Sequence, residues 1–286
     1  MADPTIPSEE FQLASRWCAL SVLGSRRLRS SARTPLALNR LWREHAKPKL
    51  SAPEALSLRR WFAEGNQVLF PWTDEFPESL RAIPDPPVAL FVSGDLNALN
   101  RPRVAIVGSR SASHTGVAFA RELAAALAAK GALVVSGLAQ GIDYAAHSGA
   151  LGCQQPTVAI PGSGLSNIYP RSHQGLAQKI LLSGGVLLSE YAPWVAARKA
   201  SFPARNRLIS GLTAGVVVVQ AALKSGSLIT ARLAAEQGRE VMAVPGLPGA
   251  PNTAGCNALL RDGAALIECA QDVFDALNWS FSSSNR

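Results

Sequence analysis

The pattern of hydrophobic and polar positions becomes regular after about residue 100, where short apolar runs alternate with longer amphipathic stretches. The apolar runs predict buried strands, which are Val104–Val107, Leu133–Val135, Val158–Ile160, Val186–Leu188, Val216–Val219 and Val241–Val244. Uninterrupted apolar strands that alternate with helices indicate a parallel sheet with both faces covered. We therefore expect an α/β architecture with a doubly wound, mostly parallel sheet of about six strands.

The stretches between these runs have helical periodicity. Val117–Ala129 places Phe119, Leu123 and Leu127 on one face, and Gly131 ends that helix. Further helices are expected over Ile142–Ala150, Leu228–Gln237, Asn257–Asp262 and Gln271–Leu277.

The first part of the chain has a different pattern. Residues 8–64 contain apolar positions at helical spacing, such as Leu13, Trp17 and Leu20, and predict short helices. Residues 71–95 are rich in proline and suggest a connector that lies on the following domain. We therefore divide the chain into a small helical domain at residues 1–70 and a larger α/β domain at residues 71–286.

Composition and charge narrow the function. The chain has 286 residues, 48% of them hydrophobic and 17% charged, which suffices for a real core. Residues 101–286 hold 16 Lys and Arg against 9 Asp and Glu, an excess of +7, whereas residues 1–100 hold 12 against 11. This excess favours an anionic partner, although a solubilising surface would produce it too.

Several features point to a cytoplasmic protein. No apolar run approaches about 18 residues, so no membrane-spanning helix is expected. The acidic, proline-containing start does not resemble a signal peptide. The four cysteines are scattered without a C-x-x-C pair, which fits a reducing compartment.

The loops that follow the strands are rich in glycine and small residues. In a parallel α/β sheet these loops meet at the carboxyl edge, where ligands bind. Small residues allow close approach of backbone N–H groups, and a helix N-terminus behind the loop favours an anion. Several of the loops also carry Arg or Lys, so we favour phosphate binding over purely structural turns. The loops are Gly108–Arg110, Ser136–Asp143, Pro161–Gly164, Ser189–Tyr191 and Lys224–Ser227.

The segment from Arg198 to Arg207 combines one aromatic ring, Phe202, with four cations. Single-stranded nucleic acid is held by cations on phosphates and by rings stacked on bases. We expect Lys199 and Phe202 to contact DNA, and Arg205 and Arg207 to be partly structural. The alternative is that Phe202 fills the core and the arginines pair with Asp143 or Glu190.

Motifs of other functions are absent from the sequence. No G-x-G-x-x-G follows the first strand, and no P-loop motif occurs, so neither a dinucleotide nor ATP hydrolysis is expected. The four histidines have no metal-ligand spacing, and His147 is interpreted as a hydrogen-bonded structural residue. Ser109 and Ser227 have no evident catalytic partners. We therefore expect no cofactor, no metal and no enzymatic activity.

Several of these motifs together resemble the DNA-processing protein A (DprA, or Smf) family. They occur in the family's order over roughly residues 75–270. The matching stretches are Gly108–Arg110, Ser136–Asp143 with Ala146-His147, Gly162–Leu165 with Tyr169-Pro170, Ser189–Tyr191, Phe202–Leu212, Ser225–Ala231, Arg239–Val241 and Ala243–Gly246.

The resemblance implies an extended Rossmann-like fold, a small SAM-like helical domain at the N-terminus, and homodimers. It also implies single-stranded DNA binding without chemistry, and a role in natural transformation, where the protein protects incoming strands and helps load the RecA recombinase. By motif position, Arg110, Arg171, Lys199 and Phe202 would contact DNA. The full candidate set is Ser109, Arg110, Gly137, Gly162, Gly164, Arg171, Lys199, Phe202, Arg205, Arg207 and Lys224.

The sequence departs from the family pattern at several positions. Gln140 stands where many members have arginine, His173 where an asparagine often follows the Tyr-Pro turn, and Gln220 where a glutamate is frequent. The sequence ends at Arg286, where many members continue into a small winged-helix-like domain. Duplex binding through such a domain is therefore not expected from these residues.

Two alternative functions stay open. Related Rossmann-like hydrolases process nucleoside monophosphates with a P-G-G-x-G-T-x-x-E loop whose glutamate does acid–base work. The comparable loop here, Ser225–Arg232, has no acid at that place, so general acid–base catalysis lacks its residue. The second alternative is a scaffold that contacts the recombinase and rarely touches DNA, which the positive edge disfavours.

Overall fold

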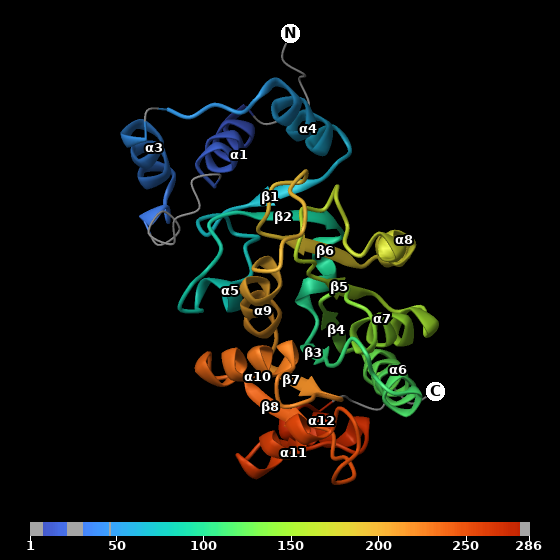
Figure 1. Cartoon of the computed structure of the whole chain (residues 1–286). Helices are drawn as coiled ribbons and strands as arrows, with labels where there is room; N and C mark the ends of the chain where they lie inside the picture. The colour runs from blue at the N-terminus through green and yellow to red at the C-terminus, as the bar shows by residue number, and fades with distance from the viewer. Residues whose placement is uncertain (1–7, 22–30, 46, 281–286) are drawn as a thin grey trace.

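The computed structural model describes residues 8–21, 31–45 and 47–280 of the chain (Figure 1). The described part contains one nine-stranded sheet with the order β1-β2-β6-β5-β4-β3-β7-β8-β9. The strands are β1 (Gln67–Leu69), β2 (Leu90–Gly94), β3 (Arg103–Val107), β4 (Leu133–Ser136), β5 (Thr157–Ala159), β6 (Val186–Ser189), β7 (Gly215–Val218), β8 (Glu240–Ala243) and β9 (Ala265–Leu266).

The strands from β3 to β9 pair in parallel, as the apolar runs predict. In the central register, Ala105 of β3 lies opposite Val135 of β4 and Val216 of β7. The six predicted strands are all present, each within one residue of its expected bounds. The expected doubly wound, mostly parallel α/β sheet is therefore confirmed.

Three strands were not predicted, and two of them correct the reading of the N-terminal part. β1 lies inside residues 1–70, which the sequence indicates to be all-helical, and β2 lies inside the proline-rich connector. β1 pairs antiparallel with β2, and β2 pairs antiparallel with β6. The prolines before β2 hide it, although Leu90, Phe91 and Val92 are a buried apolar run like the others. The division of the chain at residue 70 stays a prediction.

The helices cover both faces of the sheet. Alternate residues of each strand point to opposite faces. Ala105 and Val107 of β3 therefore pack with α5, α9, α10 and α11, whereas Val104 and Ile106 pack with α6, α7 and α12. The helices of the α/β part are α5 (Glu78–Arg81), α6 (His114–Ala129), α7 (Ile142–Gly152), α8 (Gln174–Leu182), α9 (Ser201–Leu212), α10 (Gly226–Glu236), α11 (Ala254–Arg261) and α12 (Ala270–Ala276), with 3₁₀ turns η1 (Leu96–Asn100) and η2 (Arg171–His173).

The N-terminal helices α1 (Ser8–Ser21), α3 (Pro35–Glu44) and α4 (Ala52–Ala63) lie beside the β1–β2 edge (Figure 1). Trp17 and Trp61 belong to the same buried cluster as Phe91 of β2. The Trp61 and Phe91 rings meet edge to face at 6.2 Å, and the Val68 N–H donates to the Glu10 carboxylate at 3.2 Å. The helical part is therefore joined to the sheet by a continuous apolar core.

The strand order places a topological switch between β3 and β7. The chain proceeds from β3 through β4 and β5 to β6 on one side, and continues from β7 to β8 on the other side of β3. The loops that leave β3 and β7 therefore diverge and open a crevice at the carboxyl edge, which is where open α/β sheets bind ligands.

Candidate functional site

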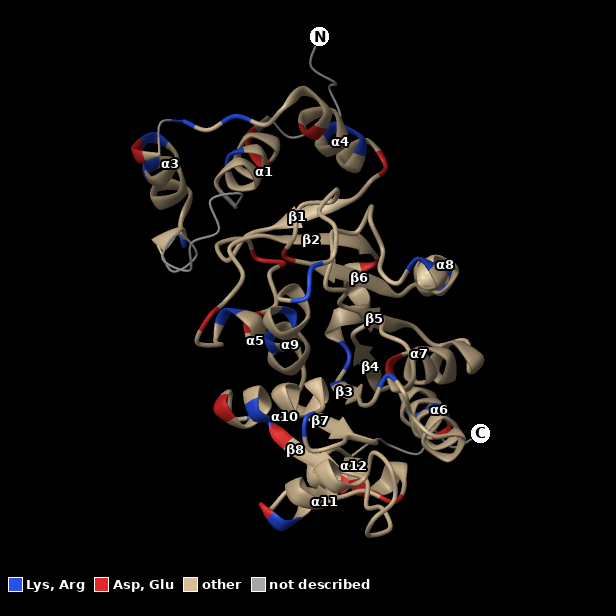
Figure 2. Cartoon of the chain, viewed as in Figure 1, with Lys and Arg blue, Asp and Glu red and all other residues tan. Residues whose placement is uncertain are grey.

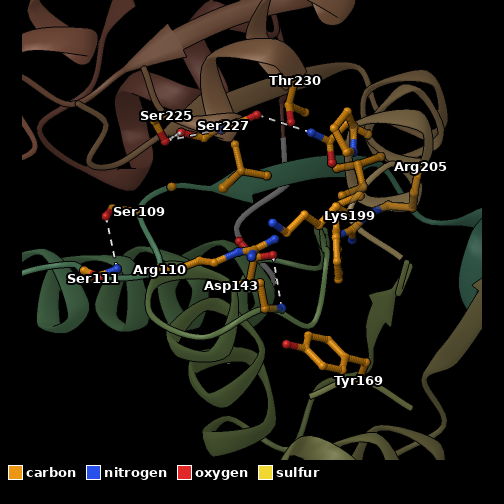
Figure 3. A pocket seen from close by; sticks show the side chains of 18 residues that line it. Ser109, Arg110, Ser111, Asp143, Tyr169, Lys199, Arg205, Ser225, Ser227 and Thr230 are labelled. Carbon is orange, nitrogen blue, oxygen red and sulfur yellow. Dashed lines mark hydrogen bonds between the residues drawn. The ribbon is translucent and has the colours of Figure 1, made fainter. Parts of the chain in front are cut away.

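A pocket of about 590 Å³ opens at this switch point. Its walls come from the loop after β3, the turn before α7, the start of α9 and the start of α10 (Figure 3). The lining residues include five of the eleven predicted site residues, which are Ser109, Arg110, Lys199, Phe202 and Arg205. The expectation that the glycine-rich loops converge on one edge therefore matches the geometry, and DNA contact by these residues stays a prediction.

The pocket is positively charged. Arg110 and Lys199 are exposed, and their side chains point into the same space from different walls (Figure 3). Arg205 lines the floor and is buried. Asp143 is the one carboxylate among the lining residues, and it too is buried. Lys and Arg segments also lie around α9 in the view of the whole chain (Figure 2).

An aromatic surface lies beside these cations. The Arg110 guanidinium lies over the Phe202 ring at 4.7 Å from its centroid. The Tyr169 ring lies 5.6 Å from the Phe202 ring with an interplanar angle of 55°. Phe202 is half-buried and Tyr169 is exposed, so Phe202 is not the core plug that the alternative interpretation required. Sequence reasoning quoted Tyr169 only as part of a turn and missed its ring.

The turn before α7 is held from inside the protein. The Asp143 carboxylate accepts hydrogen bonds from the backbone N–H groups of Gly137 at 3.1 Å and Ala139 at 3.3 Å. Burial raises the pKa of Asp143, against the opposing effects of the Arg205 charge and these hydrogen bonds. A Cβ on Gly137 would lie 2.0 Å from the Arg205 Nη1. Glycine at 137 thus makes room for a guanidinium, and its N–H serves Asp143.

Arg205 occupies this space with little solvent around it. Its Nη1 donates to the Ile160 carbonyl, and its Nε is buried without a partner among the described residues. Burial lowers the pKa of Arg205 to about 10, with the Asp143 carboxylate acting in the opposite direction. The guanidinium therefore supplies a fixed positive floor, as the expected structural role implies.

Close packing inside the protein also requires glycine at two other predicted site positions. A Cβ on Gly162 would lie 2.8 Å from Cδ1 of Phe202, so Gly162 sets the depth at which that ring sits. A Cβ on Gly164 would lie 2.0 Å from the Ala192 carbonyl oxygen, and the Gly164 N–H donates to the Val195 carbonyl at 2.8 Å. The Gly164 N–H is therefore already used inside the protein.

The opposite end of the pocket is lined by hydroxyl groups. Ser225 caps α10 by accepting from the Ser227 N–H, and the two serine hydroxyls lie 2.8 Å apart (Figure 3). The Ser109 hydroxyl accepts from the Ser111 N–H at 3.2 Å. Thr230, one turn into α10, also lines the pocket. Neutral donors beside a helix N-terminus suit a phosphate oxygen.

Besides the three glycines, three predicted residues lie outside this pocket. Arg171 begins the η2 turn and is exposed, and Lys224 is exposed just before the α10 cap. Arg207 is buried and donates from both terminal nitrogens to the Glu190 carboxylate, at 2.8 and 2.6 Å. Burial lowers the pKa of Arg207, but the carboxylates of Glu190 and Asp85 outweigh burial and raise it overall. Arg207 therefore has the structural pairing that we considered for it.

The structure shows where the three residues that depart from the family pattern lie and what they contact. Gln220 ties β7 to α6, because its Oε1 accepts from the Ser113 N–H and its Nε2 donates to the Ser113 hydroxyl. His173 is buried, and its Nδ1 lies 2.9 Å from the Leu138 carbonyl, which joins the Tyr-Pro turn to the turn before α7. Gln140 is exposed and lines a small side pocket beside Tyr169.

No cluster of three or more His, Cys, Asp or Glu side chains suited to a metal occurs among the described residues. His147 is buried on α7 and hydrogen-bonds Thr157, as the sequence predicts for a structural histidine. Within the same residues, no helix combines the length and the apolar character that a bilayer crossing requires.

Fold and site together define an extended Rossmann-like α/β protein with an open, basic, partly aromatic pocket at its topological switch point. Residues 67–278 match the family of DNA recombination-mediator protein A. The chain belongs to this family, as the sequence motifs indicate.

Relatives and solved structures agree with this assignment. Protein Smf of Escherichia coli is 43% identical over 247 residues, which are 86% of this chain and 65% of that protein. DNA processing protein DprA of Bacillus subtilis is 42% identical over 204 residues, 71% of this chain and 68% of that protein. The alignments thus span about two thirds of the length of these relatives.

Two solved structures share the fold. DNA processing protein A from Streptococcus pneumoniae superposes with a TM-score of 0.75 at 34% identity, over 95% of this chain and 98% of that one. DNA processing protein A from Helicobacter pylori, whose structure concerns its single-stranded DNA binding mode, has a TM-score of 0.66 at 33% identity, over 74% of this chain and 95% of that one.

Proposed function

We propose that this chain binds single-stranded DNA in the pocket at the β3–β7 switch and performs no chemistry on it. The observation on which the proposal rests is the half-buried Phe202 ring, which lies under the Arg110 guanidinium in a pocket that Lys199 also lines. Cations placed beside an accessible ring are what a flexible strand requires, because phosphates and bases alternate along it.

The pocket favours a single strand over a duplex. Phe202 lies inside a concave site between α9 and the turn before α7, and its ring can stack only on a base that is free to enter. In a duplex the base faces are stacked on their neighbours, so entry would require the cost of unstacking. An unpaired strand presents its base faces without that cost.

The relatives support the same function. The protein from Helicobacter pylori, one third identical, is described by its single-stranded DNA binding mode. We extend the proposal to natural transformation in the cytoplasm, where this chain would protect incoming strands as a homodimer and help load the RecA recombinase. Family membership is the support for these partners.

Hydrolysis of a nucleotide is the competing function. The loop Ser225–Arg232 would have to supply a general base, and it contains no carboxylate. The pocket's own carboxylate, Asp143, accepts two backbone hydrogen bonds on the floor. The absence of enzymatic activity is therefore part of the proposal.

A direct comparison of ligands tests the proposal. We expect a labelled single-stranded oligonucleotide to bind far more tightly than AMP or dTMP, and neither nucleotide nor DNA to be turned over. Equal affinity for a mononucleotide, or hydrolysis that copurifies with the protein and is lost in Asp143→Asn, would contradict it. A protein that retains its fold but binds no DNA would favour the scaffold function instead.

A further inference from the structure

A second cationic pocket lies at the opposite edge of the sheet. Its volume is about 570 Å³, and its walls come from the segments that lead into β3, β7 and β8. The lining residues include Ser79, Arg101, Arg103, Ala214, Arg239 and Trp279. Three of them are arginines and none is acidic, a composition that the fold by itself does not require.

The arginines have no carboxylate partner among the described salt bridges. Arg103 donates from Nε to the Leu212 carbonyl at 2.7 Å and from Nη1 to the Leu99 carbonyl. Arg239 donates from one terminal nitrogen to the Ser79 and Gly211 carbonyls, at 3.1 and 3.3 Å. All of these acceptors are neutral backbone carbonyls, so the positive charges of the two arginines are not neutralised.

Two donors behind the wall of this pocket lack a partner. The Nε of Arg239 and the hydroxyl of Ser79 are both fully buried, without a hydrogen-bond partner in the described part of the chain. A buried donor without an acceptor costs free energy, and native proteins leave few of them. Burial lowers the pKa of Arg103, and the positive charge of Arg239 lowers it further.

Capping of the α9 C-terminus explains part of this arrangement. Cations stabilise the negative end of a helix, and α9 ends at Leu212 beside Arg103 and Arg239. Capping does not explain the third arginine of the lining, Arg101, which donates to the neutral Gln155 side chain at 2.9 Å.

We propose that this pocket is a second anion site, which takes the phosphate of a nucleotide on Arg101, Arg103 and Arg239 with its base against the half-buried Trp279. Arginine forks match phosphate oxygens in pairs, and indole is an effective stacking surface for a base. The nucleotide can be free or part of a strand, and both sources have the same chemistry. The site is independent of the proposed function, because it lies at the other edge of the sheet.

The test needs a background in which the first pocket is disabled. In Arg110→Ala/Lys199→Ala, dTMP, inorganic phosphate and a short oligothymidylate are titrated by calorimetry. We expect dTMP to bind this background and to bind more tightly than inorganic phosphate. A much tighter oligothymidylate would identify a strand as the source, and equal affinities of dTMP and oligothymidylate would identify a free nucleotide.

The matched variants change one exposed residue of the pocket rim. Ala214→Glu adds a negative charge there and should weaken dTMP binding about tenfold, whereas Ala214→Gln should not. Leu182→Glu, at the exposed last residue of α8, controls for net charge. The proposal is overturned if dTMP does not bind the background, if inorganic phosphate binds as tightly as dTMP, or if Ala214→Glu and Ala214→Gln bind alike. Since all of these variants alter exposed side chains, thermal melting should confirm that each is folded.

Discussion

The Phe202 ring is contacted by Arg110 and Tyr169 and is supported from below by the space that Gly162 leaves. Such a ring can stack on a base without being part of the main core. The cations beside the ring, Arg110 and Lys199, are exposed, so their charged ends can reach the phosphates of a strand. At the level of single residues, we therefore expect DNA binding to depend on the Phe202 ring and on the cations Arg110 and Lys199 beside it.

Replacing the ring separates stacking from packing. We expect Phe202→Ala to weaken single-stranded DNA binding by about 1–3 kcal/mol, roughly 5- to 150-fold, with little loss of stability. Binding titrations and thermal melts measure the two quantities. Lys199→Ala is the control, since it should weaken binding without lowering the melting temperature. A Phe202→Ala protein that melts far lower but binds normally while folded would exclude stacking.

His147 makes a prediction about pH. The Thr157 hydroxyl donates to the Val134 carbonyl, so its oxygen accepts from the Nδ1 of His147, and Nε2 is buried without a described partner. Burial, followed by the charges of His173 and Arg205, lowers the pKa of His147 to about 3. The ring is therefore neutral in the folded protein over the range in which it gains a proton in the unfolded chain.

The difference between the folded and unfolded pKa of His147 sets the direction in which stability changes with pH. The lowered pKa gives a contribution to stability that is complete above the unfolded value near 6.5 and declines as the pH falls toward 3. Between pH 7 and pH 5 the free energy of unfolding should fall by roughly 2 kcal/mol because of His147. Denaturant melts of His147→Leu should lack this part of the decline. A variant with the same pH dependence as the parent protein would show that His147 titrates normally.

Helix α9 is the element that joins site and scaffold. Phe202 and Arg205, near its start, line the pocket, whereas Arg207 faces Glu190 and Asp85 away from it. Of the segment first singled out, the helix carries Phe202, Arg205 and Arg207, and its two sides separate the pocket from the Arg207 ion pairs. The sequence did not reveal that this segment is helical from Ser201, because its polar residues obscure the periodicity.

The Arg207–Glu190 pair should stabilise the fold and not the complex. Removing one partner leaves a buried charge unpaired, so Arg207→Ala should lower the free energy of unfolding by about 3–5 kcal/mol. Urea denaturation measures this loss. Glu190→Gln should produce a smaller loss when combined with Arg207→Ala than when it is introduced alone. If Arg207→Ala retained its stability and lost DNA affinity, Arg207 would be a DNA contact after all.

Much of the fold could be predicted from local pattern, and part of the site could not. Buried parallel strands such as β3 and β7 are uninterrupted apolar runs, so they are evident. β1 is only three residues long, and the prolines before β2 obscure its short apolar run, so neither strand is evident from the sequence. Lys199 and Phe202 were evident because one short segment combines several cations with an aromatic ring. Tyr169 joins the site only through its contact with Phe202, which is 33 positions away, and a local sequence pattern cannot reveal such a contact.

At the scale of the whole molecule we predict a homodimer. β9 is an edge strand with Leu266 half exposed, and α11 next to it carries the partly buried Leu259 and Leu260. An apolar sheet edge of this kind is a surface for pairing. Light scattering at micromolar concentration should give twice the mass of the chain, and Leu266→Lys should shift the protein toward monomer. A monomeric parent protein would refute the prediction.

We expect the cations in the switch-point pocket to hold the phosphates of a single strand. The most direct test is the salt dependence of single-stranded DNA affinity in the parent protein and in Arg110→Ala/Lys199→Ala. Each phosphate contact contributes a log–log slope of about −0.7, so the parent affinity should fall steeply with salt and the double variant should lose about 1.4 of that slope. An affinity that barely changes with salt, or a double variant with the parent's slope, would contradict the account.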